Sequence, residues 1–198
     1  MKRLIAAAAA VLLMSGCAYN AQKAVLSPTV VVAKSEEGRG TAVGLRVVDE
    51  RASKSLGHRG TAYGKAAQIT TDQDIAAVVQ DKVSEGLRNK GYTVVPYAGA
   101  STGLSIEVRS LDYSTSQGFW TGGVAVNASM KAVAKKPGDT YERMYRSDKE
   151  RRVAVVPTAG KNQEDLNDGL SGVLAQLFDD VGLFRFLNNG NAHSANAE

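Results

Sequence analysis

The sequence predicts an α+β fold: a two-layer sandwich in which an antiparallel sheet meander carries two helices packed on one face. Two observations predict it. Between Leu104 and Val156, apolar and polar residues alternate in successive segments, which is the period of half-buried strands. Two other segments, beginning near Thr71 and Asn162, repeat apolar residues at helical spacing. Since each helix has one apolar stripe, we expect both stripes to pack on the apolar face of one sheet.

The chain before the first helix is predicted to be mostly extended. Residues 24–33 (AVLSPTVVVA) predict a strand or an extended arm. Pro28 has no N–H to donate to a ladder, so a strand here would lie at a sheet edge. The segments that follow are a turn cluster at 35–40, a half-buried strand at 43–47, a polar loop at 49–60 and a weaker strand at 63–70.

The first helix is predicted to open at Thr71 and to close at residues 89–91. Thr71 and Asp74 have the spacing of a capping box, with Asp in place of the usual Glu. Gly91 stands where a left-handed C-cap is expected. The apolar stripe consists of Ile75, Val78, Val79, Val83 and Leu87. A short strand at 92–95 follows.

Three strands of a meander are predicted next. In the first, the alternation that starts at Leu104 slips at Leu111, which predicts a β-bulge. The second alternates cleanly over residues 124–134, and Pro-Gly-Asp at 137–139 predicts a turn. The third, residues 140–156, mixes tyrosines and valines with many charges. One face of this meander is expected to be buried and the other to meet water.

The second helix is predicted to be the longer one. Asn162 is its candidate N-cap, and its apolar stripe runs over residues 166–187. Gly169 and Gly172 each cost about 1 kcal/mol of helix propensity relative to Ala, which indicates a close approach to the sheet. Residues 188–198 have no apolar period and predict a disordered tail.

Composition limits the function classes. The chain has 43% hydrophobic and 22% charged residues, which is typical of a globular domain. Its formal charge is +4, from 24 basic and 20 acidic residues. Lys2 and Arg3 belong to the leader described below, and without them 22 basic residues remain against 20 acidic ones. This small positive net charge does not indicate a nucleic-acid partner. Cys17 is the only cysteine, which excludes an internal disulfide.

The first 20 residues, MKRLIAAAAAVLLMSGCAYN, have the organisation of an export signal. A basic start at residues 2–3 precedes an apolar run over residues 4–14, and small residues follow it. This run is shorter than the roughly 20 residues that a membrane-spanning helix needs. Residues 14–17, Met-Ser-Gly-Cys, resemble the lipobox of bacterial lipoproteins, with Met14 in place of the usual Leu. The alternative is an ordinary secretory signal with an incidental cysteine.

The lipobox resemblance implies cleavage between Gly16 and Cys17, followed by attachment of diacylglycerol and an N-acyl chain such as palmitate to Cys17. Each buried acyl methylene contributes about 0.8 kcal/mol, and two or more chains give stable anchoring. The residue after the cysteine is Ala18 and not Asp, which in the family pattern favours the outer membrane, facing the periplasm. The predicted divisions are a signal peptide at 1–16, a lipidated N-terminus and tether at 17–23, a periplasmic α+β domain at 24–187 and a tail at 188–198.

Further segments extend the resemblance along the chain. They are the lipobox, Leu26-Ser27-Pro28-Thr29, the helix from Asp72 into Lys90-Gly91-Tyr92, Ser116-Gln117-Gly118, Tyr145-Arg146 and the helix over 166–187. In this order and spacing the chain is similar to the YajG family of bacterial lipoproteins, which are largely uncharacterised. The resemblance covers nearly the whole mature chain. It implies an envelope lipoprotein and supplies no catalytic residues.

Residues suited to catalysis are sparse. His58 lies in a polar loop, where a solvated histidine is a simpler interpretation than a general base, and His193 lies in the predicted tail. A zinc site needs three or four Cys, His or carboxylate ligands, which the two separated histidines do not suggest. We therefore expect that the protein is not an enzyme and that it binds no metal and no cofactor, apart from the covalent lipid on Cys17.

Two stretches are candidates for binding. Residues 114–123 (STSQGFWTGG) place Gln117, Phe119 and Trp120 between two strands, where exposed aromatics would anchor a partner. The alternative is that Trp120 folds back into the core. The other candidate is an anion-binding set on the last strand, consisting of Arg143, Arg146 and Arg151. Such charges also suit a wet edge strand that resists aggregation.

These patterns lead to two hypotheses of function. The first is a non-catalytic structural or accessory protein, held to membrane lipid through Cys17 and docked on an envelope protein complex. The alternative is a binding module for cell-wall glycan or lipopolysaccharide, which would use the arginines of the last strand.

Overall fold

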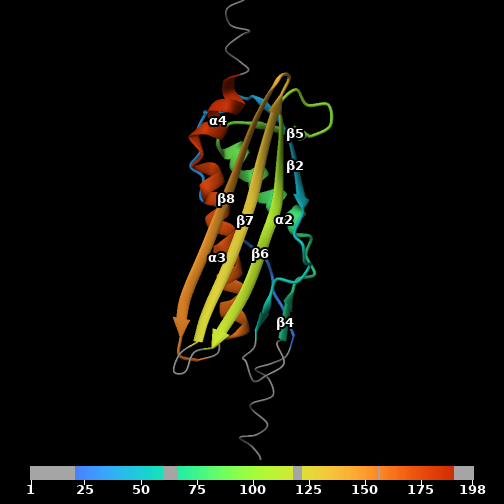
Figure 1. Ribbon diagram of the computed structural model, residues 1–198. Coiled ribbons are helices and arrows are strands. Elements are labelled where there is room, and N and C mark those ends of the chain that lie inside the picture. Colours follow the sequence, from blue (N-terminus) through green and yellow to red (C-terminus); the bar gives the residue numbers. More distant parts are fainter. Residues whose placement is uncertain (1–20, 60–66, 118–121, 156, 190–198) are drawn as a thin grey trace, which may run out of the picture.

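The computed structural model describes residues 21–59, 67–117, 122–155 and 157–189. Within them the fold is α+β, as predicted: helices pack on one face of a twisted sheet (Figure 1). The helices are α2 (Ile75–Asn89), α3 (Ala159–Phe178) and α4 (Val181–Asn188). The five-stranded sheet has the order β5 (Thr93–Pro96), β2 (Ala42–Asp49), β6 (Gly103–Gln117), β7 (Gly122–Lys136) and β8 (Asp139–Val153). A small sheet joins β1 (Gln22–Lys23), β4 (Ala67–Thr70) and β3 (His58–Arg59).

The predicted meander consists of β6, β7 and β8, which pair antiparallel along their whole lengths. The register shifts between Val108 and Ser110, so the expected bulge is confirmed just before Leu111. The rest of the sheet differs from the prediction, because β2 pairs parallel with both β6 and β5. The sheet is therefore mixed. Alternating apolar residues predict a strand but contain no information about the direction of its neighbour.

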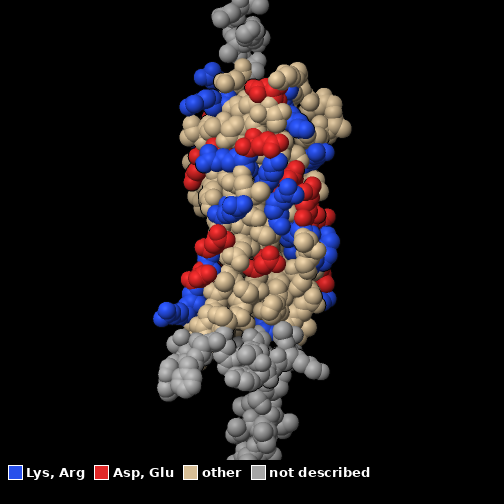
Figure 2. Space-filling view, in the orientation of Figure 1, with Lys and Arg blue, Asp and Glu red and all other residues tan. Residues whose placement is uncertain are grey.

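The two faces of the meander have opposite characters. Alternate residues of β7, among them Val124, Val126 and Met130, are buried beneath the helices. The intervening residues, such as Asn127, lie on the other face, which we call the open face. Figure 2 shows Lys and Arg mixed with Asp and Glu over this face. Each strand of the meander has 15 residues and is therefore about 50 Å long, which makes the molecule elongated.

Helix α2 begins three residues later than predicted. Its N-cap is Asp74, whose side chain accepts hydrogen bonds from the backbone N–H groups of Ala76 and Ala77. Thr71 lies before the helix. Gly91 has φ +83°, so the predicted left-handed residue at the helix end is confirmed.

The single long helix that the sequence predicts is two helices. Thr158 caps α3, and Asn162, the predicted cap, is buried inside the first turns instead. The helix is interrupted before Asp180. The Asp180 carboxylate accepts hydrogen bonds from the N–H groups of Gly182 and Leu183 and thereby caps the start of α4. The apolar stripe continues across the break, which is why periodicity did not reveal it. Helix α4 reaches Asn188, the first residue of the predicted tail.

The glycines of α3 let the helix approach the sheet closely. A Cβ added to Gly169 would lie 2.9 Å from Cγ1 of Val126, and one added to Gly172 would lie 2.7 Å from Oγ of Ser147. Both distances are shorter than side chains tolerate, so the predicted reason for these glycines is confirmed.

Residues 24–33 form an extended arm and not a strand. The backbone N–H of Val25 donates to Oε1 of Gln163 at 2.8 Å, and the N–H of Ser27 donates to Oδ1 of Asn167 at 2.7 Å. One turn further along α3, Oγ of Ser171 accepts from Thr29. Helix side chains spaced four residues apart thus replace a strand partner. Ala24, Leu26 and Pro28 of the arm point inward and are buried, and Gln22 of β1 is buried in the same alternation.

Candidate functional site

The structure leaves several sequence-predicted residues untested. Gly16 and Cys17, with Phe119 and Trp120, lie outside the described residues. Of the three residues predicted to bind in this stretch, only Gln117 is described, and only by its backbone, which ends β6 in register with Gly122.

The three arginines of the predicted anion site do not come together. Arg143 is in register with Ala132 and Arg151 with Val124, two buried residues, so both arginines lie on the helix side of β8. The even-numbered Arg146 lies on the open face. Eight residues separate Arg143 from Arg151, which corresponds to about 26 Å along a strand.

Arg143 belongs to a cluster around Asp180. The Asp180 carboxylate is 1% exposed and lies 3.1 Å from Nη1 of Arg143. It accepts hydrogen bonds from the hydroxyls of Tyr145 at 2.6 Å and Tyr141 at 2.8 Å. We call these four residues the Asp180 cluster. It ties β8 to the start of α4.

The environment of the Asp180 cluster stabilises the charged carboxylate. Burial by itself raises the pKa of Asp180, but donation from Tyr145, Tyr141 and the backbone, with the charge of Arg143, lowers it below its ordinary value. Burial is also the main reason why the pKa of Tyr145 is raised. Because side-chain and backbone donors occupy both carboxylate oxygens, the cluster has the arrangement of a structural link between elements.

A second polar cluster lies at the other end of β8. Arg151 Nη2 lies 2.6 Å from Oδ2 of Asp165, while Nζ of Lys161 lies 3.3 Å from Oδ1. Beside it, the Tyr113 hydroxyl donates to Oδ1 of the buried Asn162 at 2.6 Å. Burial and the charge of Asp165 raise the pKa of Tyr113 to about 12. We call these five residues the Asp165 cluster.

The Asp165 cluster holds the start of the arm. Asn162 Nδ2 donates to Oε1 of Gln22 at 2.9 Å, and Nε2 of Gln22 donates to the carbonyl of Ala159 at 2.7 Å. This role of Asn162 was not predicted from the sequence. A signal existed, because Asn162 is one helical turn before Leu166 and therefore lies on the apolar stripe. A polar residue on such a stripe predicts a buried hydrogen bond.

Two of the hollows among the described residues are lined by both polar and apolar groups. One lies between α2 and the edge strand β5, and its lining is Leu45, Gln80, Asp81, Ser84, Arg88, Val94, Val95 and Pro96. The other lies at the end of the meander where β6 and β8 finish. Its lining is Ser114, Thr115, Ser116, Gly122, Gly123, Val124, Ala125, Glu150, Arg151 and Arg152. Among the described residues, no three His, Cys, Asp or Glu side chains are arranged to hold a metal ion.

Comparison with known families identifies the family to which the chain belongs. Residues 28–188 match the model of a family described as an uncharacterized lipoprotein. The chain belongs to this family, which is YajG-like, so the resemblance seen in the sequence is confirmed. No curated protein matches the chain. Within the part of the chain that the structure describes, no helix has the length and apolar character needed to span a membrane.

Several solved structures are similar in fold. Protein XCC0632 from Xanthomonas campestris is 16% identical, with a TM-score of 0.50 over 85% of this chain and 98% of that one. A putative neuraminyllactose-binding hemagglutinin homolog from Helicobacter pylori is 8% identical, with a TM-score of 0.49 over 86% and 99%. A minor lipoprotein from Acinetobacter baumannii is 9% identical, with a TM-score of 0.41 over 77% and 95%.

Proposed function

We propose that this lipoprotein is an accessory component of the outer membrane, anchored through Cys17 and facing the periplasm, that binds an envelope protein complex and does not catalyse a reaction. The lipobox at Gly16 and Cys17, the Ala18 that follows and the lipoprotein family all support this proposal. The absence of Asp after the cysteine is what favours the outer membrane.

The observation that carries the proposal is the way in which the arm begins. The fold starts at Gln22, five residues after Cys17. An extended chain spans at most about 3.6 Å per residue, so this link keeps the domain within about 18 Å of an acylated Cys17. The arm is also hydrogen-bonded to α3 at Val25, Ser27 and Thr29. Such a short link to a rigid body suits a component that has a defined position in a membrane complex.

The hollow beside β5 is the surface that we assign to the partner. Gln80, Ser84 and Arg88 line it with a spacing of four residues, the same spacing as the α3 side chains that hold the arm. Arg88 has no carboxylate partner among the described residues. We therefore expect the occupant to be an extended segment of an envelope protein, with an acidic residue placed beside Arg88.

Photocrosslinking in intact cells tests this assignment. A photoreactive amino acid in place of Gln80 should capture one envelope protein, and mass spectrometry should place the crosslink in an extended acidic segment. The matched control is Ala175, which is equally exposed on α3 but away from the hollow. Capture of the same proteins from both positions would contradict docking at this hollow.

A second experiment tests the anchor itself. Cys17→Ser should leave an uncleaved precursor without acyl chains, because the thiol that accepts diacylglycerol is gone. The mass of the protein isolated from membranes measures this directly. Acylated mature protein in the variant would overturn the lipobox assignment.

Trp120→Ala separates the two interpretations of the predicted binding loop. If Trp120 anchors a partner, the variant should fold normally and lose the complex. Thermal unfolding and recovery of the crosslinked complex are both measured. Loss of folding would place Trp120 in the core and remove it from the interface.

Binding of lipopolysaccharide or cell-wall glycan is the second candidate function. The three arginines first assigned to it are separated, but Arg152 is an exposed cation at the hollow between β6 and β8. Binding through this cation should weaken as salt rises, since ions screen exposed charges. Equal or absent binding of purified glycolipid and glycan at low and high salt would contradict it.

A further inference from the structure

The place where the arm enters the fold is rigid. Gln22 is in register with Ile69 in the small sheet, and its side chain bridges the carbonyl of Ala159 and the amide of Asn162. The N–H of Ala24 then donates to the carbonyl of Thr70 at 2.8 Å. The chain therefore leaves the fold beside the first turn of α3, at the end of the molecule where β4 lies (Figure 1).

The hollow between β6 and β8 lies at this same end. Arg151, which contributes to its lining, bonds to Asp165 on the first turns of α3, and the Gln22 side chain contacts that same part of the helix. β6 also ends here, at Gln117, in register with the first residue of β7. The anchor side of the arm and the hollow are thus neighbours, and both are about 50 Å from the turn between β7 and β8.

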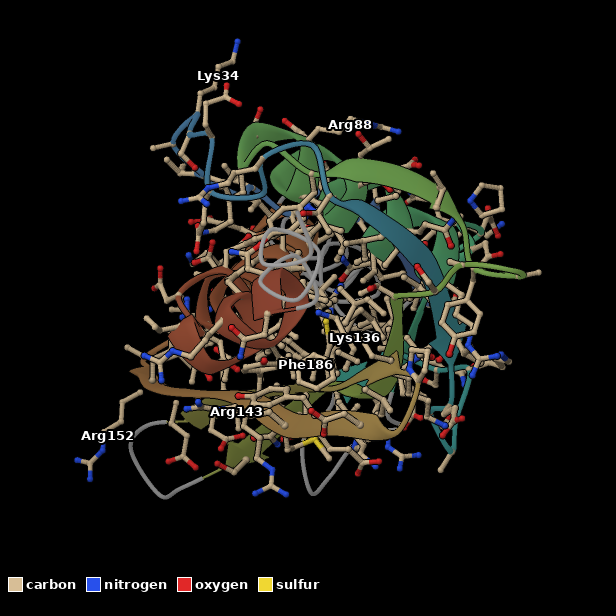
Figure 3. The ribbon with its side chains drawn as sticks, turned by 90° about the horizontal axis from the view of Figure 1, so that it is seen from above. Lys34, Arg88, Lys136, Arg143, Arg152 and Phe186 are labelled. Atoms are coloured by element: carbon tan, nitrogen blue, oxygen red, sulfur yellow. The ribbon has the colours of Figure 1, made fainter. Side chains whose placement is uncertain are left out.

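The lining of this hollow suits an oxyanion. Ser114 and Ser116 supply hydroxyl groups on the open face, and Oγ of Ser116 lies over Gly123, where a Cβ would be only 2.5 Å from it. Arg152 is exposed and has no ion pair among the described residues, and Figure 3 shows its side chain pointing away from the protein. The lining contains one carboxylate, Glu150, which limits how much negative charge the hollow accepts.

An apolar side chain accompanies these polar groups. Val155 lies two residues beyond β8 and is 78% exposed. Exposure of this apolar side chain to water is unfavourable, whereas burial in a lipid interface would lower its free energy. Val155 is three residues from the exposed Arg152, so a lipid surface at this end would offer phosphate to the cation and acyl chains to the apolar side chain.

We propose that this end of the protein rests on the lipid surface and that the hollow receives the phosphate of an anionic phospholipid headgroup, with Arg152 as the charged contact. The inference rests on the proposed acylation of Cys17. The reach of the link supports it, since the four steps along the chain from Cys17 to Ala21 span at most about 14 Å. The end formed by α4 and by the turn between β7 and β8 then points away from the membrane.

Fluorescence quenching on vesicles tests this orientation. Full-length acylated protein is reconstituted in phosphatidylcholine vesicles, with or without phosphatidylglycerol, that contain a lipid with a nitroxide on its headgroup. A fluorophore is attached to Val155→Cys or to Pro137→Cys; each is the only free thiol, because the sulfur of acylated Cys17 is a thioether. We expect strong quenching at position 155 when phosphatidylglycerol is present and no quenching at position 137.

Two variants of the Val155→Cys protein test the hollow. One Arg near an anionic surface contributes about fivefold to association, so Arg152→Gln should lower the ratio of quenched to unquenched molecules about fivefold. Ser114→Asp should act in the same direction by placing a carboxylate in the hollow. The matched control is Arg185→Gln, which removes an exposed cation from α4 at the opposite end of the molecule and should not change the quenching.

The outcomes separate this inference from the proposed function. Mass spectrometry of the reconstituted protein first establishes whether Cys17 is acylated, and a protein without acyl chains overturns both. With acylated protein, equal quenching at positions 155 and 137, or quenching at neither, overturns the orientation. Quenching at 155 that is insensitive to phosphatidylglycerol and to Arg152→Gln overturns the headgroup contact.

Discussion

The two ends of β8 are built on the same plan but differ in how completely they are closed. At each end an arginine on the helix side of the strand meets an aspartate from the helical layer. The side chain of Asp180 is 1% exposed and that of Asp165 is 11% exposed. Two tyrosines complete the first pair, whereas the second lies beside an open hollow.

The difference indicates where the molecule is available for binding. A carboxylate that is saturated with donors links β8 to α4 and has no capacity for a ligand. The other end has the same ion-pair chemistry, but it also holds the arm and leaves Arg152 exposed. If this end binds a lipid headgroup as proposed, incomplete closure marks the binding surface of this protein and burial of a charge pair does not.

Asp180→Ala should produce the largest loss of stability. It leaves Arg143, Tyr141 and Tyr145 without their shared acceptor and removes the cap of α4. Breaking a buried charged network of this kind costs about 3 kcal/mol. Urea unfolding measures the loss. A change below that of Asp165→Ala would contradict the comparison of the two ends.

Asn162→Ala should rank second, at about 2 kcal/mol, because the buried hydroxyl of Tyr113 and the amide of Gln22 lose their partner. The arm should also loosen. Limited proteolysis between residues 24 and 33 is the specific measurement, since Asp180→Ala, at the opposite end, should leave cleavage there slow. Equal cleavage in both variants would mean that Asn162 acts only through global stability.

Acid should weaken the closed end in a recognisable way. The folded pKa of Asp180 lies below its ordinary value of 3.8, so its stabilising contribution is complete above that value and is lost as pH falls through the folded pKa. Unfolding free energies measured from neutral pH down to acid should show this loss in the natural protein. In Asp180→Asn, the unfolding free energy should lack this part of its dependence on pH.

Asp165→Ala should cost less, about 1 kcal/mol, because its partner Arg151 is 35% exposed and the pair is partly screened by solvent. Arg151→Ala should lower the free energy of unfolding by the same amount, because it removes the other partner of the same ion pair. A much larger loss would show that the hollow is more closed in solution than the exposure of these side chains indicates.

Gln163→Ala should have the smallest effect, about 0.5 kcal/mol, because it removes one exposed hydrogen bond to the arm. Hydrogen exchange of the Val25 amide is the direct readout and should accelerate while the meander is unchanged. Unchanged exchange would mean that packing of the arm's inward side chains holds it without help from α3.

Much of the fold was predictable, because strand and helix periods are local. The bulge before Leu111, the left-handed Gly91 and the close approach at Gly169 were each indicated by the residue itself and its neighbours. The candidate site was less predictable. Arg143 and Arg151 alternate correctly along the strand, but only the helical layer shows that both face aspartates.

The sequence by itself determined the α+β class, the strands of the meander and membership of the lipoprotein family, since these follow from patterns along the chain. Only the tertiary structure decided that β2 pairs in parallel, that the last helix breaks at Asp180 and that the arm is held by helix side chains. Each of these depends on a partner far away in the sequence. A one-dimensional pattern shows that a group needs a partner, and only the folded chain shows which partner it has.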